Sequence, residues 1–537
     1  MTDLYAASRT ESVELLRQAL GALRPEHDTP IGIVHPYWAR KPMNVVSTII
    51  ECLSEPGDLV VDPFMGSGTT VFSSLMVNRS VVGSDISPLS QFVVGSVLDL
   101  VDNAELLLPE IKRILRLHKE QTLPWFEIDD GVYIERERFR VEGEFRDGAF
   151  ELVRTEIVTK QEIRGKWSAR RTLSDSKSLE TVRASDSVPP NRDPVDFAAV
   201  CLPENTRIAI PSGARLGHYF TSQNQASINE LLQIMDDSPL AASHGNALKL
   251  ILSASLPMLR LSDKKASSQW PYWRPKENLT SRNPVMVLQE RFKQIEAMVE
   301  WAKVEFPRSN LAGHFQIFTL PAQSLHTKQL QRKADLVLTD PPYGDQVPYG
   351  EYSAMWNAVL NLVVPESLQK KELVRSNARH LREDSAEYLQ RLAEVFVANA
   401  DLVSDRGYLA WFYQDQDLAC WSTIYQASRQ SGLQLLDVIA FPKQRRSFKT
   451  LTSPNATLDG DLLCVFSREP EHGSLKGSYI RDQHVAPHDR EVTTYFNRYA
   501  HLIASAMRTG DIMRLAAKYG TVKRALAEGM AKSCIGS

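Results

Sequence analysis

The stretch VVDPFMGSGTT, residues 60–70, decides the fold that the sequence predicts. A short apolar run ends at Asp62, the glycines Gly66 and Gly68 follow, and a helical pattern begins behind them. A parallel strand that is buried on both faces has such an unbroken apolar run. RSVVGSD, residues 79–85, repeats the run after the helix. The segment therefore predicts one right-handed βαβ unit.

Five later segments have the same strand character: residues 314–320, 334–340, 407–413, 435–441 and 461–467. We expect an α/β fold, a Rossmann-like sheet that is interrupted by a large inserted α+β region and then resumed. The predicted divisions are a helical leader (1–30), the first part of the sheet domain (31–100), the insertion (101–310), the second part of the sheet domain (311–470) and a helical C-terminal tail (471–537).

The overall composition excludes several classes of protein. The chain has 537 residues, 62 Lys and Arg against 65 Asp and Glu, and a net charge of −3, so it is no histone-like basic protein. Five cysteines lie far apart without a CxxC pair, and neither His35 nor His218 has a histidine or cysteine at a metal-ligand spacing, so neither a disulfide framework nor a metal site is predicted. The acidic start and the lack of a long apolar stretch predict a cytoplasmic protein without a membrane partner.

The glycine turn after the first strand is suited to a cofactor. Doubly wound sheets bind ligands at the carboxyl ends of their strands, where glycine lets the backbone approach closely. The turn is not GxGxxG, and it lacks the GK[ST] of a phosphate loop. Asp85 ends the next strand, where a carboxylate can accept both hydroxyls of a ribose. Taken alone, the glycine cluster could be a plain strand-to-helix turn, and Asp85 could be a helix-capping or turn aspartate.

A second motif, LVLTDPPYG, occupies residues 336–344. Its apolar run delivers Asp340 to the end of a strand. Pro341 and Pro342 hold the backbone extended and have no amide hydrogen, so their carbonyl oxygens are free to accept. Tyr343 adds an aromatic face. Two acceptors and a stacking face suit an amino group that is attached to a flat ring.

At these two motifs the sequence resembles the amino-methyltransferases of DNA, which methylate an exocyclic nitrogen with S-adenosylmethionine. The resemblance covers roughly residues 30–95 and 310–467. It implies a Rossmann-like SAM-dependent methyltransferase sheet whose insertion is a target-recognition region. It also implies catalytic roles for Asp340, Pro341, Pro342 and Tyr343. The implied cofactor-binding residues come from the glycine turn, from the end of the second strand and from HPYWARKP (35–42), a segment that closes over the methionine end of the cofactor: Asp62, Pro63, Phe64, Gly66, Ser67, Gly68, Thr69, Asp85, Ile86, His35, Tyr37, Arg40 and Lys41.

The expected function follows from this chemistry. An exocyclic amino nitrogen is a poor nucleophile because its lone pair is delocalised into the ring. Acceptance of its two hydrogens by Asp340 and by the Pro341 carbonyl favours the pyramidal form, and in-line positioning can then contribute about 7 to 11 kcal/mol. In a duplex the base must leave the stack, and Tyr343 would hold it. Aspartate at the first motif position favours adenine N6 by resemblance. The predicted protein is thus an adenine-specific DNA methyltransferase of a restriction-modification or phage-defence system, with DNA as partner and a cognate endonuclease or defence subunits as further candidates.

Three alternatives stay open at this point. Cytosine N4 is a similar amino group. Guanine-N2 methyltransferases of transfer RNA also show a DPPYG-like motif, and Gly344 is present here, although those enzymes place an RNA-binding module before the cofactor motif. A cofactor-sensing or DNA-binding subunit without catalysis is the third, but such a subunit has no chemical need for Asp340.

Basic segments with embedded aromatic residues are candidates for phosphate contact. Residues 160–171 and 441–455 have this character, and so do residues 270–276, although each alone is more often a solvated surface loop. The residues predicted to bind nucleic acid are Lys443, Arg445, Arg446, Lys449, Arg170 and Arg171.

Overall fold

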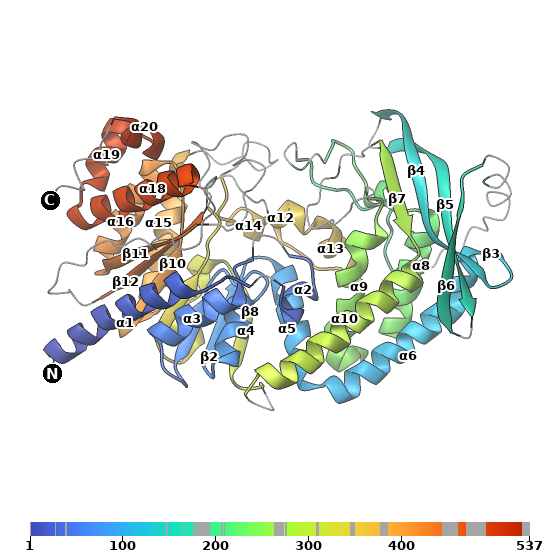
Figure 1. The fold of residues 1–537 in the computed structure, drawn as a ribbon, viewed down its shortest axis with the longest axis horizontal. Helices are drawn as coiled ribbons and strands as arrows, with labels where there is room; N and C mark the ends of the chain where they lie inside the picture. The colour runs from blue at the N-terminus through green and yellow to red at the C-terminus, as the bar shows by residue number, and fades with distance from the viewer. Residues whose placement is uncertain are drawn as a thin grey trace.

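The structure of the protein is a computed structural model, in which residues 2–26, 28–37, 40–146, 149–163, 165–175, 179, 194–205, 208, 210–262, 273, 277–307, 311–343, 349–375, 385–442, 460–468 and 490–528 are described. A seven-stranded sheet with helices on both faces forms one half of the molecule, and a second, smaller sheet lies at the opposite end (Figure 1). Long helices lie between the two sheets (Figure 1).

The strands of the large sheet are β1 (Leu59–Asp62), β2 (Ser80–Asp85), β8 (Phe315–Thr319), β9 (Ala334–Thr339), β10 (Val403–Phe412), β11 (Gln434–Pro442) and β12 (Gly460–Ser467). Their order across the sheet is β11-β12-β10-β9-β1-β2-β8. Strand β12 is antiparallel to both of its neighbours, and all other neighbours are parallel. The chain builds outward from β1 on one side and then from β9 on the other. In such sheets, ligands bind outside the carboxyl ends of the strands where the order reverses, here between β1 and β9.

Alternate residues of each strand enter two separate cores. Leu336 and Leu338 of β9 belong to the core on one face, and Val337 belongs to the core on the other. Because both faces are covered, the strands are continuous apolar runs instead of alternating ones. The first face is covered by α1 (Thr2–Ala22), α3 (Met43–Leu53), α4 (Thr69–Met76) and α5 (Pro88–Asp102), and the second by α15 (Ser385–Leu402), α16 (Leu418–Gln430), α18 (Arg490–Thr509), α19 (Ile512–Tyr519) and α20 (Val522–Ala527).

The chain between α5 and β8 forms the other half of the molecule (Figure 1). Its strands β3 (Glu127–Asp129), β4 (Val132–Arg146), β5 (Ala149–Ile163), β6 (Lys166–Leu173) and β7 (Asn278–Arg282) make an antiparallel sheet. Its helices are α6 (Ala104–Thr122), α8 (Ser222–Asp236), α9 (Ala241–Leu259) and α10 (Pro284–Glu305). One apolar core runs from the large sheet through α5 into α9, where Val97 and Leu248 are fully buried. This shared core ties the inserted region to the sheet domain.

Shorter helices and single turns connect these elements. They are α2 (Pro30–Ile33), α11 (Thr327–Leu330), α12 (Tyr349–Tyr352), α13 (Ala354–Val359), α14 (Glu366–Gln369) and the single turns η1 (Leu123–Phe126), η2 (Leu216–Tyr219) and η3 (Ala322–Ser324).

Helices from both ends of the chain meet at Asp437, a fully buried residue of β11. Arg17 of α1 donates from Nε to Asp437 Oδ2 at 3.2 Å. Arg508 of α18 donates from Nη2 to Asp437 Oδ1 at 3.0 Å. Removing one partner of a buried, hydrogen-bonded ion pair is strongly destabilising. The segments predicted as leader and tail are therefore bound to the edge of the same sheet.

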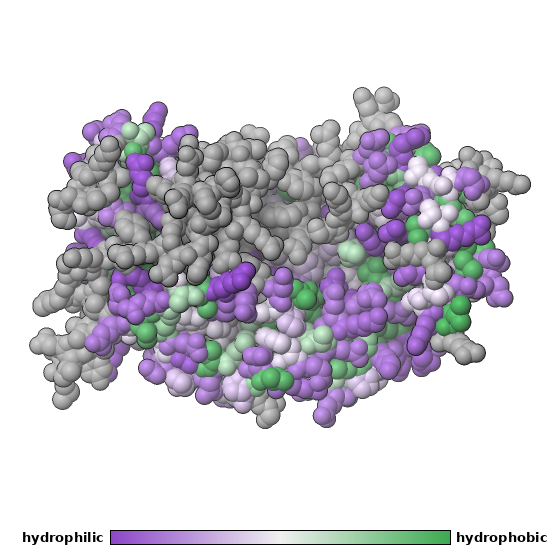
Figure 2. Space-filling model, viewed as in Figure 1, coloured by the Kyte–Doolittle hydropathy of each residue, from purple (hydrophilic) through white to green (hydrophobic). Residues whose placement is uncertain are grey.

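The predicted secondary structure is confirmed in the described residues. All seven apolar runs are strands of the large sheet, and the predicted insertion contains both helices and strands. Thr221 caps α8, because its hydroxyl accepts a hydrogen bond from the Asn224 amide. Among the described helices, none combines the length and the hydropathy that crossing a bilayer requires. On the face that Figure 2 shows, hydrophobic residues of the described surface are scattered among hydrophilic ones.

Candidate active site

The glycine turn between β1 and α4 depends on backbone conformations that favour glycine. Gly66 has φ +52° and Gly68 has φ +84°. A Cβ atom on Gly68 would lie 2.6 Å from Val94 Cγ2, so this glycine allows α4 to pack closely against α5. A Cβ atom on Gly66 would instead meet the Tyr37 ring at 3.5 Å. Gly68 is thus a packing residue, whereas Gly66 faces the cavity described below.

Asp85, at the end of β2, holds this turn in place. Its Oδ2 accepts a hydrogen bond from the Gly66 amide at 2.8 Å, and its Oδ1 accepts one from the Ser87 amide at 2.8 Å. Burial raises the pKa of Asp85 to about 6, although these amide hydrogen bonds oppose the shift. The carboxylate therefore connects the ends of two neighbouring strands.

Asp62 makes the corresponding connection to β9. Its Oδ1 accepts hydrogen bonds from the Phe64 amide at 3.0 Å and from Thr339 Oγ1 at 2.7 Å. Burial raises the pKa of Asp62 to about 7 against the effect of these donors. The residue directly before Asp340 is thus joined to Asp62, the residue that precedes the glycine turn.

A cavity opens at this point, between the carboxyl ends of β1 and β9. Nine of the predicted site residues line it: Tyr37, Arg40, Lys41, Asp62, Phe64, Gly66, Ser67, Thr69 and Asp340. Seven others line it that the sequence reasoning did not name as site residues: Val46, Met65, Thr70, Leu338, Thr339, Tyr349 and Phe412. The two motifs, which are remote in the sequence, therefore face one cavity.

Other predicted residues lie beside this cavity instead of lining it. Asp85 is the last residue of β2, and the other six belong to the turns after β1, β2 and β9: Pro63, Gly68, Ile86, Pro341, Pro342 and Tyr343. None of the seven is among the lining residues. His35 lies apart from it: the ring is buried, its Nε2 is hydrogen-bonded to Ser253 Oγ at 2.8 Å, and it lies 5.9 Å from the Trp356 ring. Burial lowers the pKa of His35 to about 3, so the ring is neutral at pH 7. It acts in this position as a packed core residue.

Asp340 is engaged by Lys41, whose Nζ lies 3.0 Å from Asp340 Oδ2. The same Nζ lies 3.1 Å from Asp461 Oδ1. Tyr343 is half-buried, and its hydroxyl donates to Asp461 Oδ1 at 3.4 Å. Its ring meets Tyr413 edge-on, with the centroids 6.0 Å apart. Burial raises the pKa of Tyr343, so its phenol stays protonated.

Asp461 contacts Lys41 and Tyr343 but was not among the predicted site residues, whereas Asp62, Asp85 and Asp340 were predicted because each ends an apolar run. Asp461 stands near the beginning of one, in β12. Since β12 is antiparallel to β10, the start of β12 lies beside the carboxyl end of β10, where Phe412 is. An acid that opens an apolar run could have been singled out only if the reversed direction of that strand had been predicted.

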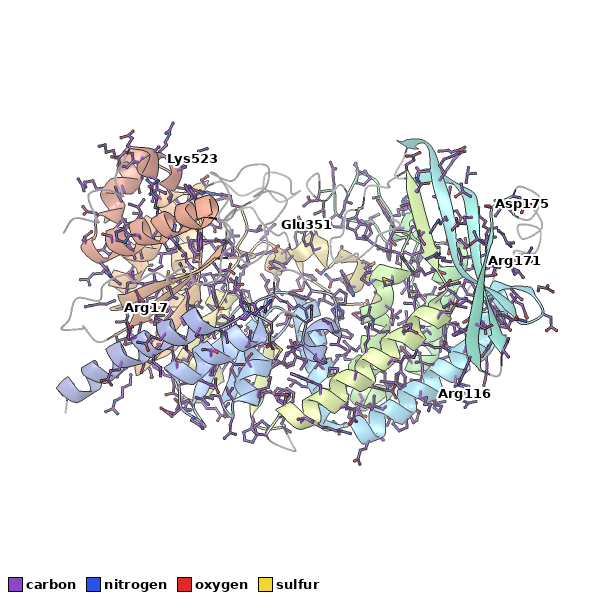
Figure 3. All side chains as sticks on the ribbon, in the orientation of Figure 1. Arg17, Arg116, Arg171, Asp175, Glu351 and Lys523 are labelled. Carbon is purple, nitrogen blue, oxygen red and sulfur yellow. The ribbon has the colours of Figure 1, made fainter. Side chains whose placement is uncertain are left out.

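The predicted nucleic-acid-binding residues are placed only in part. Lys443, Arg445, Arg446 and Lys449 lie outside the described residues. Arg170 and Arg171 belong to β6 of the second sheet, and the side chain of Arg171 is exposed at the far end of the molecule from Arg17 (Figure 3).

Two aromatic residues of the basic segments have other partners. Trp273 is buried against Tyr219 and Arg260, so it belongs to the core and offers no stacking face to a nucleic acid. Trp167 donates from Nε1 to Gln289 Oε1 at 2.8 Å.

Among the described residues, no group of three or more His, Cys, Asp or Glu side chains is arranged to hold a metal ion.

The architecture is a mostly parallel α/β sheet with a cavity where the strand order reverses, and it is consistent with a methyltransferase fold. Residues 10–90 match the family described as DNA methylase, whose members modify N6 or N4 amino groups. The resemblance inferred from the motifs is thereby confirmed for this part of the chain.

Individual relatives agree with the family match. The chain is 40% identical over 55 residues to the type II methyltransferase M.EcaI of Enterobacter cloacae. The matched segment is 10% of this chain and 12% of that protein. It is 30% identical over 82 residues to the type II methyltransferase M.MjaII of Methanocaldococcus jannaschii (15% and 14%). It is 43% identical over 47 residues to the type II methyltransferase M1.MboII of Moraxella bovis (9% and 18%). The matched segments thus span less than a fifth of each relative.

Proposed function

We propose that this protein is a DNA methyltransferase that transfers a methyl group from S-adenosylmethionine to the exocyclic N6 of adenine. One observation carries the proposal: Asp340 of the catalytic motif and Gly66 of the cofactor motif line the same cavity. The hydrogen bond between Thr339 and Asp62 supports it, because it keeps the two motifs side by side.

The residues at the cavity fit this cofactor. Gly66 has no side chain to block the approach of a ligand to the turn, and Asp85 lies directly behind it. A sulfonium cation is favoured near carboxyl groups, which Asp62 and Asp340 provide, while Arg40 brings positive charge that suits the carboxylate of the methionine part. When bound, the cofactor supplies an activated methyl group.

In the proposed reaction, Asp340 and the Pro341 carbonyl accept the two hydrogens of the target amine. This acceptance directs the nitrogen lone pair toward the methyl carbon. Asp340 and the Pro341 carbonyl would hold the nitrogen while it takes the methyl group that the bound cofactor would supply, and the departing sulfur would keep the electron pair of the broken bond. The surplus proton leaves the nitrogen through the Asp340 carboxylate to solvent. Tyr343 stacks on the ring that carries the amine.

The second half of the molecule is proposed to recognise the target. It is attached to the sheet domain through the shared core at α5 and α9, and it presents Arg171 to solvent. The three relatives are type II methyltransferases by name, so we propose a restriction-modification or phage-defence setting with a cognate endonuclease or defence subunits as partners.

The decisive experiment incubates the full chain with methyl-labelled S-adenosylmethionine and, in separate reactions, unmodified genomic DNA and transfer RNA. Nucleoside analysis then locates the label. We expect N6-methyldeoxyadenosine in the DNA reaction. Label on N4 of deoxycytidine would overturn the choice of base, and label on guanosine of transfer RNA would overturn the choice of substrate.

A further inference from the structure

Lys41 lies between two acidic side chains at the edge of the large sheet. Its ammonium group bridges two carboxylates that come from different strands, Asp340 after β9 at 3.0 Å and Asp461 of β12 at 3.1 Å. Its side chain is 11% exposed, against 27% and 21% for the two acids. The ion pair is therefore mostly shielded from solvent. Charge interactions are stronger in such a shielded site than in water.

Aromatic rings enclose the same ammonium group. Lys41 Nζ lies 4.9 Å from the centroid of the Phe412 ring and 5.8 Å from that of the Tyr343 ring. Both distances allow cation–π attraction. Burial by itself lowers the pKa of Lys41, but Asp340 and Asp461 outweigh it and raise the pKa well above its usual value. Lys41 is a permanent cation in this position.

We propose that Lys41 is a positioning residue for Asp340: it holds one carboxylate oxygen of Asp340 in a fixed direction and keeps the acid ionised beside Asp461. This inference rests on the proposed function. Among the described residues, the titratable and charged groups around the contact are Asp340, Asp461, Tyr343 and Tyr349, together with Asp62 in the same cavity and the neighbouring Arg40 on the segment of Lys41 itself.

The two acids explain why a cation is needed. Asp340 and Asp461 both lie within bonding distance of one nitrogen, so without that nitrogen two carboxylates would face each other in a shielded site. Like charges at such a site raise the pKa of one of the acids. A protonated Asp340 could no longer accept a hydrogen from the target amine as strongly, so methyl transfer would require a higher pH.

The test compares Lys41→Met and Lys41→Arg with the parent chain. For Lys41→Met we expect kcat to fall about tenfold or more at pH 7, with the acidic limb of the kcat profile moved upward by about one to three pH units. The affinity for S-adenosylmethionine, measured by calorimetry, is expected to change less than about threefold. Lys41→Arg retains the positive charge and should restore the pH profile. Lys249→Met, which removes a lysine bonded to Asp236 Oδ1 at 2.7 Å outside the cavity, is the control and should leave kcat unchanged.

Two further variants separate this role from a purely structural one. Asp461→Asn in the Lys41→Met background should move the acidic limb back toward the parent position, because the second negative charge is gone. Asp461→Asn alone should move that limb downward, which keeps the inference testable if Lys41→Met does not fold. An unshifted pH profile in these variants would overturn the inference, as would a Lys41→Met variant that loses cofactor affinity while kcat is retained. An inactive parent chain would count against the proposed function instead.

Discussion

Thr339 Oγ1 donates a hydrogen bond of 2.7 Å to Asp62 Oδ1, and this bond joins the ends of β9 and β1. The strands pair in register behind it, with Val60 beside Leu336 and Val61 beside Val337. The glycine turn after β1 and the Asp-Pro-Pro-Tyr segment after β9 are therefore held together by the sheet itself, although the inserted region separates them in the sequence.

Replacing Asp340 tests the catalytic role. Asp340→Ala removes the side-chain acceptor for the target amine, so we expect methyl transfer to fall at least about a hundredfold, while the dissociation constant for S-adenosylmethionine changes only a few-fold. Calorimetry and single-turnover transfer would measure the two effects separately. Asp335→Ala is the matched control, because Asp335 lies at the other end of β9, where its Oδ2 accepts from the Leu59 amide. Transfer by Asp340→Ala at the parent rate would refute the role.

Replacing Asp85 tests the support of the glycine turn. In Asp85→Ala the Gly66 amide loses its acceptor, and a ribose loses its expected one, so cofactor binding should weaken about tenfold or more. Transfer at saturating cofactor should be less affected. Asp58→Asn, which alters an aspartate outside the cavity, should bind the cofactor normally. Unchanged cofactor affinity in Asp85→Ala would show that neither interaction contributes.

Stability should depend on pH through the buried acids. Burial raises the pKa of Asp62 to about 7 and that of Asp85 to about 6, from 3.8 for an ordinary aspartate. Between pH 4 and 7 the folded state therefore keeps protons that the unfolded state releases. The contribution is fully present below pH 3.8 and is lost as the pH rises through the folded-state values, with a slope of at most about 1.4 kcal/mol per pH unit and group.

Urea unfolding at several pH values would measure this dependence. Asp62→Asn cannot titrate, so its free energy of unfolding should fall less steeply between pH 4 and 7 than that of the parent chain. Parallel curves for the two proteins would mean that Asp62 carries its charge over the whole range.

Substitutions at Gly57 and Gly68 allow the cost of backbone strain to be measured separately from the cost of lost packing. Gly57 and Gly68 have φ angles of +91° and +84°, but an added Cβ atom at Gly57 meets nothing within 4 Å, whereas at Gly68 it meets Val94 Cγ2 at 2.6 Å. Gly57→Ala should cost about 1 to 2 kcal/mol from the backbone alone. Gly68→Ala should cost about 1 to 3 kcal/mol more, because α4 and α5 must separate. Equal losses in thermal or urea unfolding would show that helix packing does not depend on Gly68.

The elements that were predicted from local pattern are those whose cause is local. Apolar runs such as residues 334–340 predicted strands correctly because a strand that is buried on both faces has few polar positions. The cavity residues Gly66, Asp62 and Asp340 were also identified, since each belongs to a motif in which neighbouring residues determine the backbone. The roles assigned to them remain predictions.

The contacts that were missed arise between segments with no common pattern. His35 was grouped with Tyr37 and Lys41 because they are close in sequence, yet its ring packs on Ser253 of α9. Asp461 entered the site because β12 is reversed relative to its neighbours. Neither the packing of His35 nor the direction of β12 could be derived from the sequence of a single segment.

The order of amino acids alone established the strands, the glycine turn and the absence of amide hydrogens at Pro341 and Pro342, because these depend on covalent geometry and on the burial of nearby apolar residues. Packing of the whole chain decided which charges meet. It placed Lys41 between Asp340 and Asp461, since only the register and direction of neighbouring strands bring three distant segments to one edge of the sheet.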